Sequence, residues 1–185
     1  MMILPIVAFG NPILRSKCQN ISTDYPDLLD LLSNMWETMY QANGVGLAAP
    51  QINKSIRLFL IDTTPFKDDE EISNDQIVKK VFINPILIEE SGEKWSFNEG
   101  CLSIPDIRED VIRNSTITIS YFDENFKKHT DVFDGLVARV IQHEYDHING
   151  VLFVDKISPL RKRMIKGKLK DITKGNVKVS YKMRF

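Results

Sequence analysis

Apolar residues recur at helical spacing near the start of the chain. A helix is expected between a cap at Thr23 or Asp24, with Pro26 in its first turn, and a stop at Asn43-Gly44. Its buried face is formed by residues three or four positions apart, namely Leu28, Leu31, Leu32, Met35 and Met39. The stretch that follows, residues 44–51, is glycine-rich and too irregular for a helix or a strand.

A second helix is predicted from about residue 134 to residue 149, where Asn149-Gly150 ends it. Its first half is apolar on nearly all sides, which predicts burial. Farther along, Ser158-Pro159 is a good start for a basic helix that reaches about residue 172. Alternating apolar positions in residues 177–185 then indicate a terminal strand.

Short strands are predicted at residues 56–62, 81–88 and 116–122. A turn at Asp123-Glu124-Asn125 leads to a partner strand near residues 128–133, and residues 66–75 form an acidic, exposed loop. Strands and helices do not alternate as in a parallel α/β fold. We therefore expect an α+β fold of mostly antiparallel short strands around a central buried helix.

Composition and charge add one feature to this picture. The 185 residues suit a single domain, and the ordinary composition excludes collagen, coiled coil and wholesale disorder. Residues 1–155 carry 13 Lys/Arg against 24 Asp/Glu, whereas residues 156–185 carry 11 against one. This basic tail, from about residue 156, is either a contact surface for a polyanion or a solvated helix face.

The two cysteines, Cys18 and Cys101, do not make a disulfide framework. The N-terminus lacks a basic region, Pro5 interrupts its apolar stretch, and no apolar run approaches the ~18 residues of a membrane span. We expect a soluble protein of the reducing cytoplasm.

The strongest chemical signal is His143-Glu144-Tyr145-Asp146-His147. Residues four apart lie on one helix face, so both imidazoles can bind one metal ion, and Glu144 can reach a water on that ion without being a ligand. The alternative is a pair of histidines held by ordinary hydrogen bonds. The apolar approach to the motif argues against it, because unpaired imidazoles are costly to bury.

A catalytic metal site usually has three protein ligands and an open position. Candidates for the third ligand are Cys101, Cys18, His129 and various carboxylates. Cys101 stands in a loop bounded by Gly100 and Pro105, and its thiolate would suit a soft or borderline cation. Taken alone, Cys101 is better interpreted as a small buried apolar residue than as a ligand, and Cys18 is interpreted as a packing residue. Spacing does not choose between these ligands.

Three separated segments resemble peptide deformylases: residues 44–51 (GVGLAAPQ), 99–103 (EGCLS) and 142–147 (QHEYDH). Their order and approximate spacing are those of the family, and smaller similarities extend the match over residues 3 to about 155. The family removes the formyl group from the N-terminal formylmethionine of nascent polypeptides by metal-assisted amide hydrolysis.

The resemblance implies roles for individual residues. The family's metal ligands match Cys101, His143 and His147, with water in the fourth position. Its catalytic acid/base matches Glu144, which takes a proton from that water and delivers it to the leaving amine. The tetrahedral oxyanion is stabilised by two donors that match the Gln51 side-chain amide and the Leu102 backbone N–H.

The resemblance also indicates a substrate site. Positions that line it in the family match Val45, Gly46, Glu99 and Gly100. Arg108 matches an arginine near the same pocket, where it either pairs with Glu99 or lies free on the surface. A departure occurs at Arg139, where some members have an apolar pocket residue.

Ligand type and resemblance differ on the metal. Two histidines and one cysteine suggest Zn²⁺. The family is typically most active with Fe²⁺, accepts Ni²⁺ or Co²⁺, and is often poor with Zn²⁺. We expect Fe²⁺ natively, with Ni²⁺, Co²⁺ or Zn²⁺ in purified samples.

The tail departs further from the family pattern. In some bacterial members it is a helix thought to dock on the ribosome, whereas here a basic segment precedes a strand. The charge predicts transient ribosome contact, without sequence-specific nucleic-acid binding or a membrane partner, through Lys162, Arg163, Lys166, Lys168 and Lys170.

Two other classes of protein share some of these features. A zincin-like endopeptidase would have the same helix motif, but it would need a longer cleft and usually a His or Glu third ligand. A non-catalytic, metal-stabilised ribosome-binding module would need neither Glu144 nor Gln51.

Overall fold

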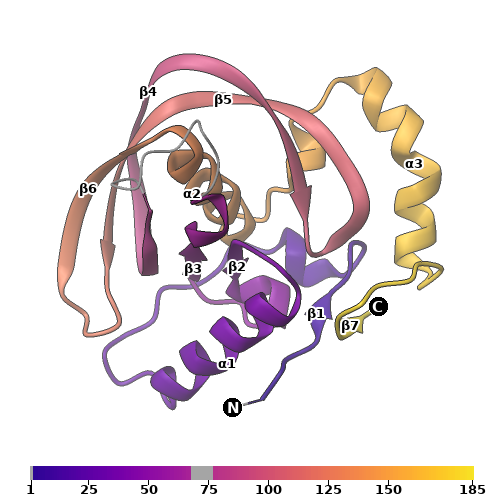
Figure 1. The fold of residues 1–185 in the computed structure, drawn as a ribbon. Helices are drawn as coiled ribbons and strands as arrows, with labels where there is room; N and C mark the ends of the chain where they lie inside the picture. The colour runs from indigo at the N-terminus through magenta and orange to yellow at the C-terminus, as the bar shows by residue number, and fades with distance from the viewer. Residues whose placement is uncertain (1, 68–76) are drawn as a thin grey trace.

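The computed structural model describes residues 2–67 and 77–185. Most of the expected acidic loop, residues 66–75, therefore lies outside the described residues. Within these residues there are three α-helices, α1 (Leu28–Gln41), α2 (Gly135–Ile148) and α3 (Pro159–Thr173), with α2 beneath the arch of the longest strands (Figure 1). The predicted α+β class with a central helix is confirmed.

A five-stranded antiparallel sheet has the order β2-β3-β4-β5-β6. The strands are β2 (Gly46–Ala48), β3 (Leu58–Asp62), β4 (Lys79–Cys101), β5 (Ile104–Phe122) and β6 (Lys128–Asp134). The predicted hairpin between the last two is confirmed, and Asp123 Oδ1 caps its turn by accepting from the N–H groups of Asn125 and Lys127 at 2.9 and 3.0 Å.

Strands β4 and β5 are much longer than expected, with 23 and 19 residues. The predicted loop around Cys101 is wrong, because Cys101 is the last residue of β4 and Pro105 already lies in β5. Only Leu102 and Ser103 separate the two strands. This tight turn holds Cys101 more firmly than a loop would.

Helix α2 begins and ends where its pattern predicts. Its mostly apolar first half is buried, and the helix contacts β2, β3 and β5. Such burial leaves little freedom to the side chains that follow, so α2 is a rigid support for His143 and His147.

Helix α1 begins later than predicted. Thr23 and Asp24 lie in a turn, and the N-cap position is taken by Asp27 in the left-handed conformation, with φ of 53°. The hydroxyl of Ser22 donates to the Asp24 carboxylate, which therefore caps a local turn instead of the helix. The predicted end at Asn43-Gly44 is confirmed, since Gly44 N–H donates to Met39 O at 2.9 Å.

The basic helix α3 begins as predicted, with the Ser158 hydroxyl accepting from Arg161 N–H at 3.3 Å. The terminal strand is shorter than expected: β7 is Met183–Arg184, and it pairs in parallel with β1 (Ile6–Val7) in a separate sheet. The C-terminal segment thus returns from α3 to the N-terminal strand (Figure 1). Within the described part of the chain, no helix is long and apolar enough to span a membrane.

Candidate metal centre and active site

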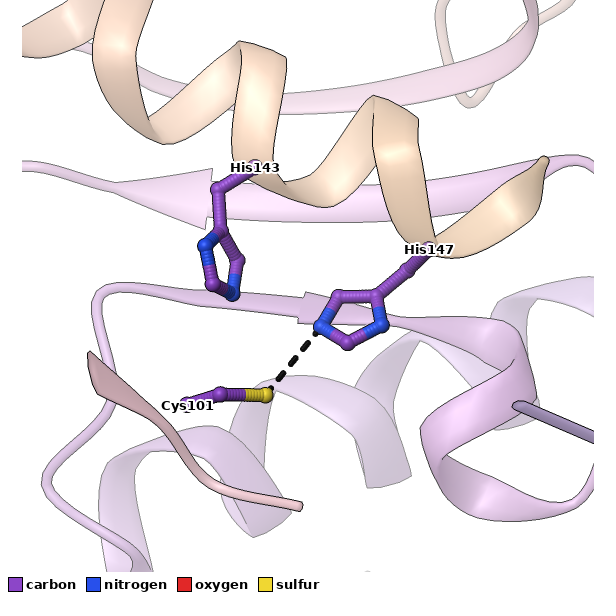
Figure 2. A group of neighbouring side chains, drawn as sticks. All are labelled: Cys101, His143 and His147. Carbon is purple, nitrogen blue, oxygen red and sulfur yellow. Dashed lines mark hydrogen bonds between the residues drawn. The ribbon is translucent and has the colours of Figure 1, made fainter. Parts of the chain in front are cut away.

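Three potential metal ligands converge at the centre of the molecule. His143 and His147 project from neighbouring turns of α2 toward Cys101 at the end of β4 (Figure 2). One ligand atom from each residue lies within 4.8 Å of the others, and Cys101 Sγ is 3.2 Å from His147 Nε2. As the four-residue spacing predicts, both imidazoles lie on one face of α2.

These residues fit a divalent metal ion. Tetrahedral coordination at ordinary Zn–S and Zn–N distances would put the ligand atoms about 3.5 Å apart. The Cys101–His147 separation is close to that value, and thiolate with imidazole is a donor set for borderline cations. Two of the other third-ligand candidates lie elsewhere: Cys18 packs in the core and His129 bonds Asp123 at 2.7 Å.

Glu99 fixes the orientation of His143. Its Oε2 lies 2.9 Å from His143 Nδ1, which leaves Nε2 of that ring for the metal. Burial opposes ionisation of Glu99, but hydrogen bonds from His143 and Arg113 outweigh it and hold its pKa well below the usual range. Glu99 therefore lies against His143 as a carboxylate.

Two buried arginines compensate the charge of Glu99. Arg113 Nε and Nη2 donate to it at 2.7 and 3.0 Å, and Arg139 Nη1 donates to it at 3.0 Å. Of the two alternatives for Arg108, pairing with Glu99 is not observed: the Arg108 side chain donates to Asn98 Oδ1 at 3.0 Å. Arg113 was not identified from the sequence. In the structure Ile107, Glu109, Val111 and Arg113 are buried on one face of β5, but the charges of Glu109 and Arg113 hide this alternation in a hydrophobicity pattern.

Arg139 takes part in this network and also lines the cavity. It is only 2 % exposed, its Nη2 donates to Trp95 O at 2.8 Å, and its guanidinium stacks 4.5 Å from the Trp95 ring centroid. These contacts hold the side chain in place. Arg139, the departure from the family pattern, therefore places a fixed cation next to Glu99, the residue that bonds the ligand His143.

Glu144 lies on the cavity side of α2 and is 4 % exposed. Burial raises the pKa of its carboxyl group to about 7. Its Oε2 has no hydrogen-bond partner among the described residues, and Gly46 of β2 leaves room for its other oxygen. A buried carboxyl group whose pKa is near neutral is suited to accept and return a proton.

Gln51 presents its amide to the same place. Its Oε1 accepts from Ala48 N–H at 2.8 Å, which directs the NH₂ group toward Cys101 Sγ at 3.6 Å and Ser103 Oγ at 3.3 Å. Leu102 occupies the turn directly after Cys101 and lines the cavity. The structure thus brings Gln51 and Leu102 beside the metal ligands.

A cavity of about 760 Å³ opens onto these residues. All the sequence-predicted substrate residues line it, namely Val45, Gly46, Glu99, Gly100 and Arg108. The C-terminal segment also contributes, through Lys178, Val179, Ser180 and Tyr181. No motif pointed to these four, because their place depends on the return of the chain from α3.

Comparison with known proteins agrees with this geometry. The sequence model of the family described as polypeptide deformylase matches residues 3–163. The chain belongs to this family. Peptide deformylases of Christiangramia forsetii and Flavobacterium johnsoniae are each 59 % identical to it, over 100 % of this chain and 96 % of theirs.

Solved deformylase structures share the fold. A crystal structure from Legionella pneumophila is 36 % identical, with a TM-score of 0.81 over 95 % of this chain and 98 % of that one. A plant peptide deformylase structure is 31 % identical, with a TM-score of 0.84 over 95 % and 92 %. The protein is a metal-dependent enzyme of this family, neither a zincin-like endopeptidase nor a non-catalytic module.

Proposed function

We propose that the enzyme hydrolyses the N-formyl group of formylmethionine at the start of nascent polypeptides and releases formate. The observation that carries this proposal is the convergence on one cavity of the metal ligands Cys101, His143 and His147 with the Glu144 carboxyl and the Gln51 amide. Amide hydrolysis needs an activated water, a proton carrier and oxyanion donors, and each has a residue here.

Cys101, His143 and His147 would hold a divalent ion, and that ion would supply the Lewis acidity that activates a water and polarises the formyl carbonyl. Glu144 takes the proton of the attacking water and later delivers it to the leaving amine of the peptide. Its pKa of about 7 matches both halves of this task. Glu99, fixed by Arg113 and Arg139, keeps the His143 ring in the orientation that ligation requires.

The oxyanion of the tetrahedral intermediate needs donors that are already in place. We assign this role to Gln51 Nε2 and to the Leu102 backbone N–H. The Ala48 N–H fixes the direction of the Gln51 amide, so no reorganisation is needed during the reaction.

Specificity must come from the methionine side chain and the peptide backbone, because a formyl group is very small. Val45, Gly46, Gly100 and Arg108 line the cavity where these groups would bind. Glu99 lines it too, but its contacts assign it to the support of His143. We infer that Fe²⁺ is the native ion, in line with the behaviour of the family, and that Ni²⁺ or Co²⁺ can replace it.

The decisive experiment is formate release from formyl-Met-Ala-Ser by protein loaded anaerobically with Fe²⁺ or Ni²⁺. Glu144→Gln keeps the volume beside Gly46 but removes the proton carrier, so kcat should fall by roughly 100–10,000-fold. Metal content should stay unchanged, because Glu144 is not a ligand. A folded, metal-loaded parent that releases no formate would contradict the proposal.

We infer that the enzyme works in the cytoplasm and meets the nascent chain at the ribosome through α3. Both cysteines are free thiols, as a reducing compartment requires. The five basic residues named in the sequence are all exposed on α3, while Arg161 is engaged with Glu109 at 2.6 Å. The helix is thereby attached to β5. Lys162 Nζ donates to Asp155 O at 2.7 Å, and the other four named cations are exposed where they can meet RNA phosphates.

A further inference from the structure

The turn between β4 and β5 carries both a metal ligand and an assigned oxyanion donor. Cys101 precedes it and Leu102 begins it, so a small rotation of this turn would move both groups. On one side the N-terminal segment holds it, since Phe9 N–H donates to Ser103 O at 2.8 Å. Gln51 Nε2 also donates a hydrogen bond to the Ser103 hydroxyl in this turn, at 3.3 Å.

The C-terminal segment holds the turn from the other side. The Tyr181 hydroxyl donates to Leu102 O at 2.7 Å, across 79 positions of sequence. The Tyr181 and Leu102 side chains are both partly buried against the same core cluster, so the bond is partly screened from competing water. This bond joins the tail directly to the residue whose N–H is assigned to the oxyanion.

Strand β7 fixes the position of Tyr181. Ile6 N–H donates to Lys182 O and Ala8 N–H donates to Arg184 O, both at 2.8 Å, immediately after Tyr181. The chain before it, Lys178, Val179 and Ser180, forms part of the cavity wall. The two ends of the chain therefore pair with each other, and each makes a hydrogen bond to the same turn, one from Phe9 and one from Tyr181.

We propose that Tyr181 is a positioning residue of the active site. Its bond to Leu102 O fixes the Leu102–Ser103 peptide group, and through the shared Cα of Leu102 it restrains the preceding peptide group, whose N–H faces the reacting carbonyl. The inference rests on the proposed function only for its catalytic readout. The bond to the Leu102 carbonyl restrains the turn, and a restrained donor stabilises the transition state without first being ordered. The tail thus completes the catalytic site as well as carrying the basic helix.

Tyr181→Phe tests this, because it removes the hydroxyl and keeps the ring. Tyr121→Phe is the matched control, since the Tyr121 hydroxyl bonds Asp131 at a similar 2.7 Å and its ring does not line the cavity. On formyl-Met-Ala-Ser, kcat of Tyr181→Phe should fall about 10-fold while KM changes less than about 2-fold, since a donor is misplaced but not lost. Metal stoichiometry should match that of the parent.

Hydrogen exchange at the Phe9 amide provides a readout that does not depend on catalysis. This amide bonds Ser103 O, so it should exchange several-fold faster in Tyr181→Phe and at the parental rate in Tyr121→Phe. Parental kcat in Tyr181→Phe, or an equal loss in both variants, overturns the positioning role. If the Phe9 amide exchanges at the parental rate in Tyr181→Phe, then Tyr181 does not restrain the turn. A parent that releases no formate contradicts the proposed function, and the exchange result still decides whether Tyr181 holds the turn.

Discussion

At Gly46 the backbone of β2 passes so close to Glu144 that a side chain has no room. A Cβ atom there would lie 2.5 Å from Glu144 Oε1 and 2.8 Å from its Cδ, about 1 Å nearer than ordinary contact allows. The atoms in the way belong to the end of a flexible side chain. The carboxyl group would therefore move, and the fold would stay.

Gly46→Ala should consequently lower kcat/KM by about 100-fold, because a 1 Å displacement of a reacting group has an effect of that size. The melting temperature should change little. Gly167→Ala is the control: Gly167 lies within α3 with nothing within 4 Å of an added Cβ, so the change should stabilise the helix by ~0.5–1 kcal/mol without affecting activity. Parental activity in Gly46→Ala would show that the Glu144 position is not critical.

At the scale of the elements, the metal centre joins β4 to α2, and Glu99 is the second link between them. Because Glu99 holds Nδ1 of His143, Glu99→Gln should weaken metal binding by roughly 10–100-fold, as measured by competition with a chelator. Glu109→Gln is the control, since Glu109 is equally buried and paired with Arg161 but does not touch a ligand. Equal metal affinity in both variants would contradict the orienting role of Glu99.

The sequence predicts an element well when its buried side chains are apolar, and poorly when they are charged. Helix α2 was predicted almost to the residue, because most of its first half is apolar and its end carries an ordinary stop signal. The long parts of β4 and β5 were not predicted, because their inner face includes Glu99, Glu109 and Arg113, which read as exposed positions in a pattern. Charges that are compensated only by tertiary contacts cannot be recognised from periodicity.

The same limit applies to the site. The helical spacing indicated His143, Glu144 and His147 from the residues alone, whereas Cys101 was chosen only through the family resemblance. Tyr181 gave no signal, because its partner Leu102 lies 79 residues away and they meet only through β7 and β1. A local pattern predicts which side chains lie on one face of a single helix or strand. The remaining contacts depend on how the two chain ends pack against the rest of the molecule.

For the molecule as a whole, charge is divided between two regions. Residues 1–155 have a balance of −11 and residues 156–185 a balance of +10, and α3 runs along one edge of the molecule beside β5 (Figure 1). Such a division orients the molecule in the field of a polyanion, with the basic helix facing it. The acidic body resists close approach elsewhere, so binding should depend on α3.

Replacing Lys166, Lys168 and Lys170 together by Glu should therefore reduce co-sedimentation with ribosomes at ~50 mM salt by at least about 10-fold, and make it less dependent on salt. The matched control is glutamate at Lys54, Lys127 and Lys128, which are also exposed and change the net charge equally. Deformylation of a free formyl-peptide should be the same in both triple variants, because none of the six lysines lines the cavity. If both triple variants lost ribosome binding equally, net charge and not α3 would be responsible. If neither lost it, α3 would be an exposed helix whose basic residues are only solvated.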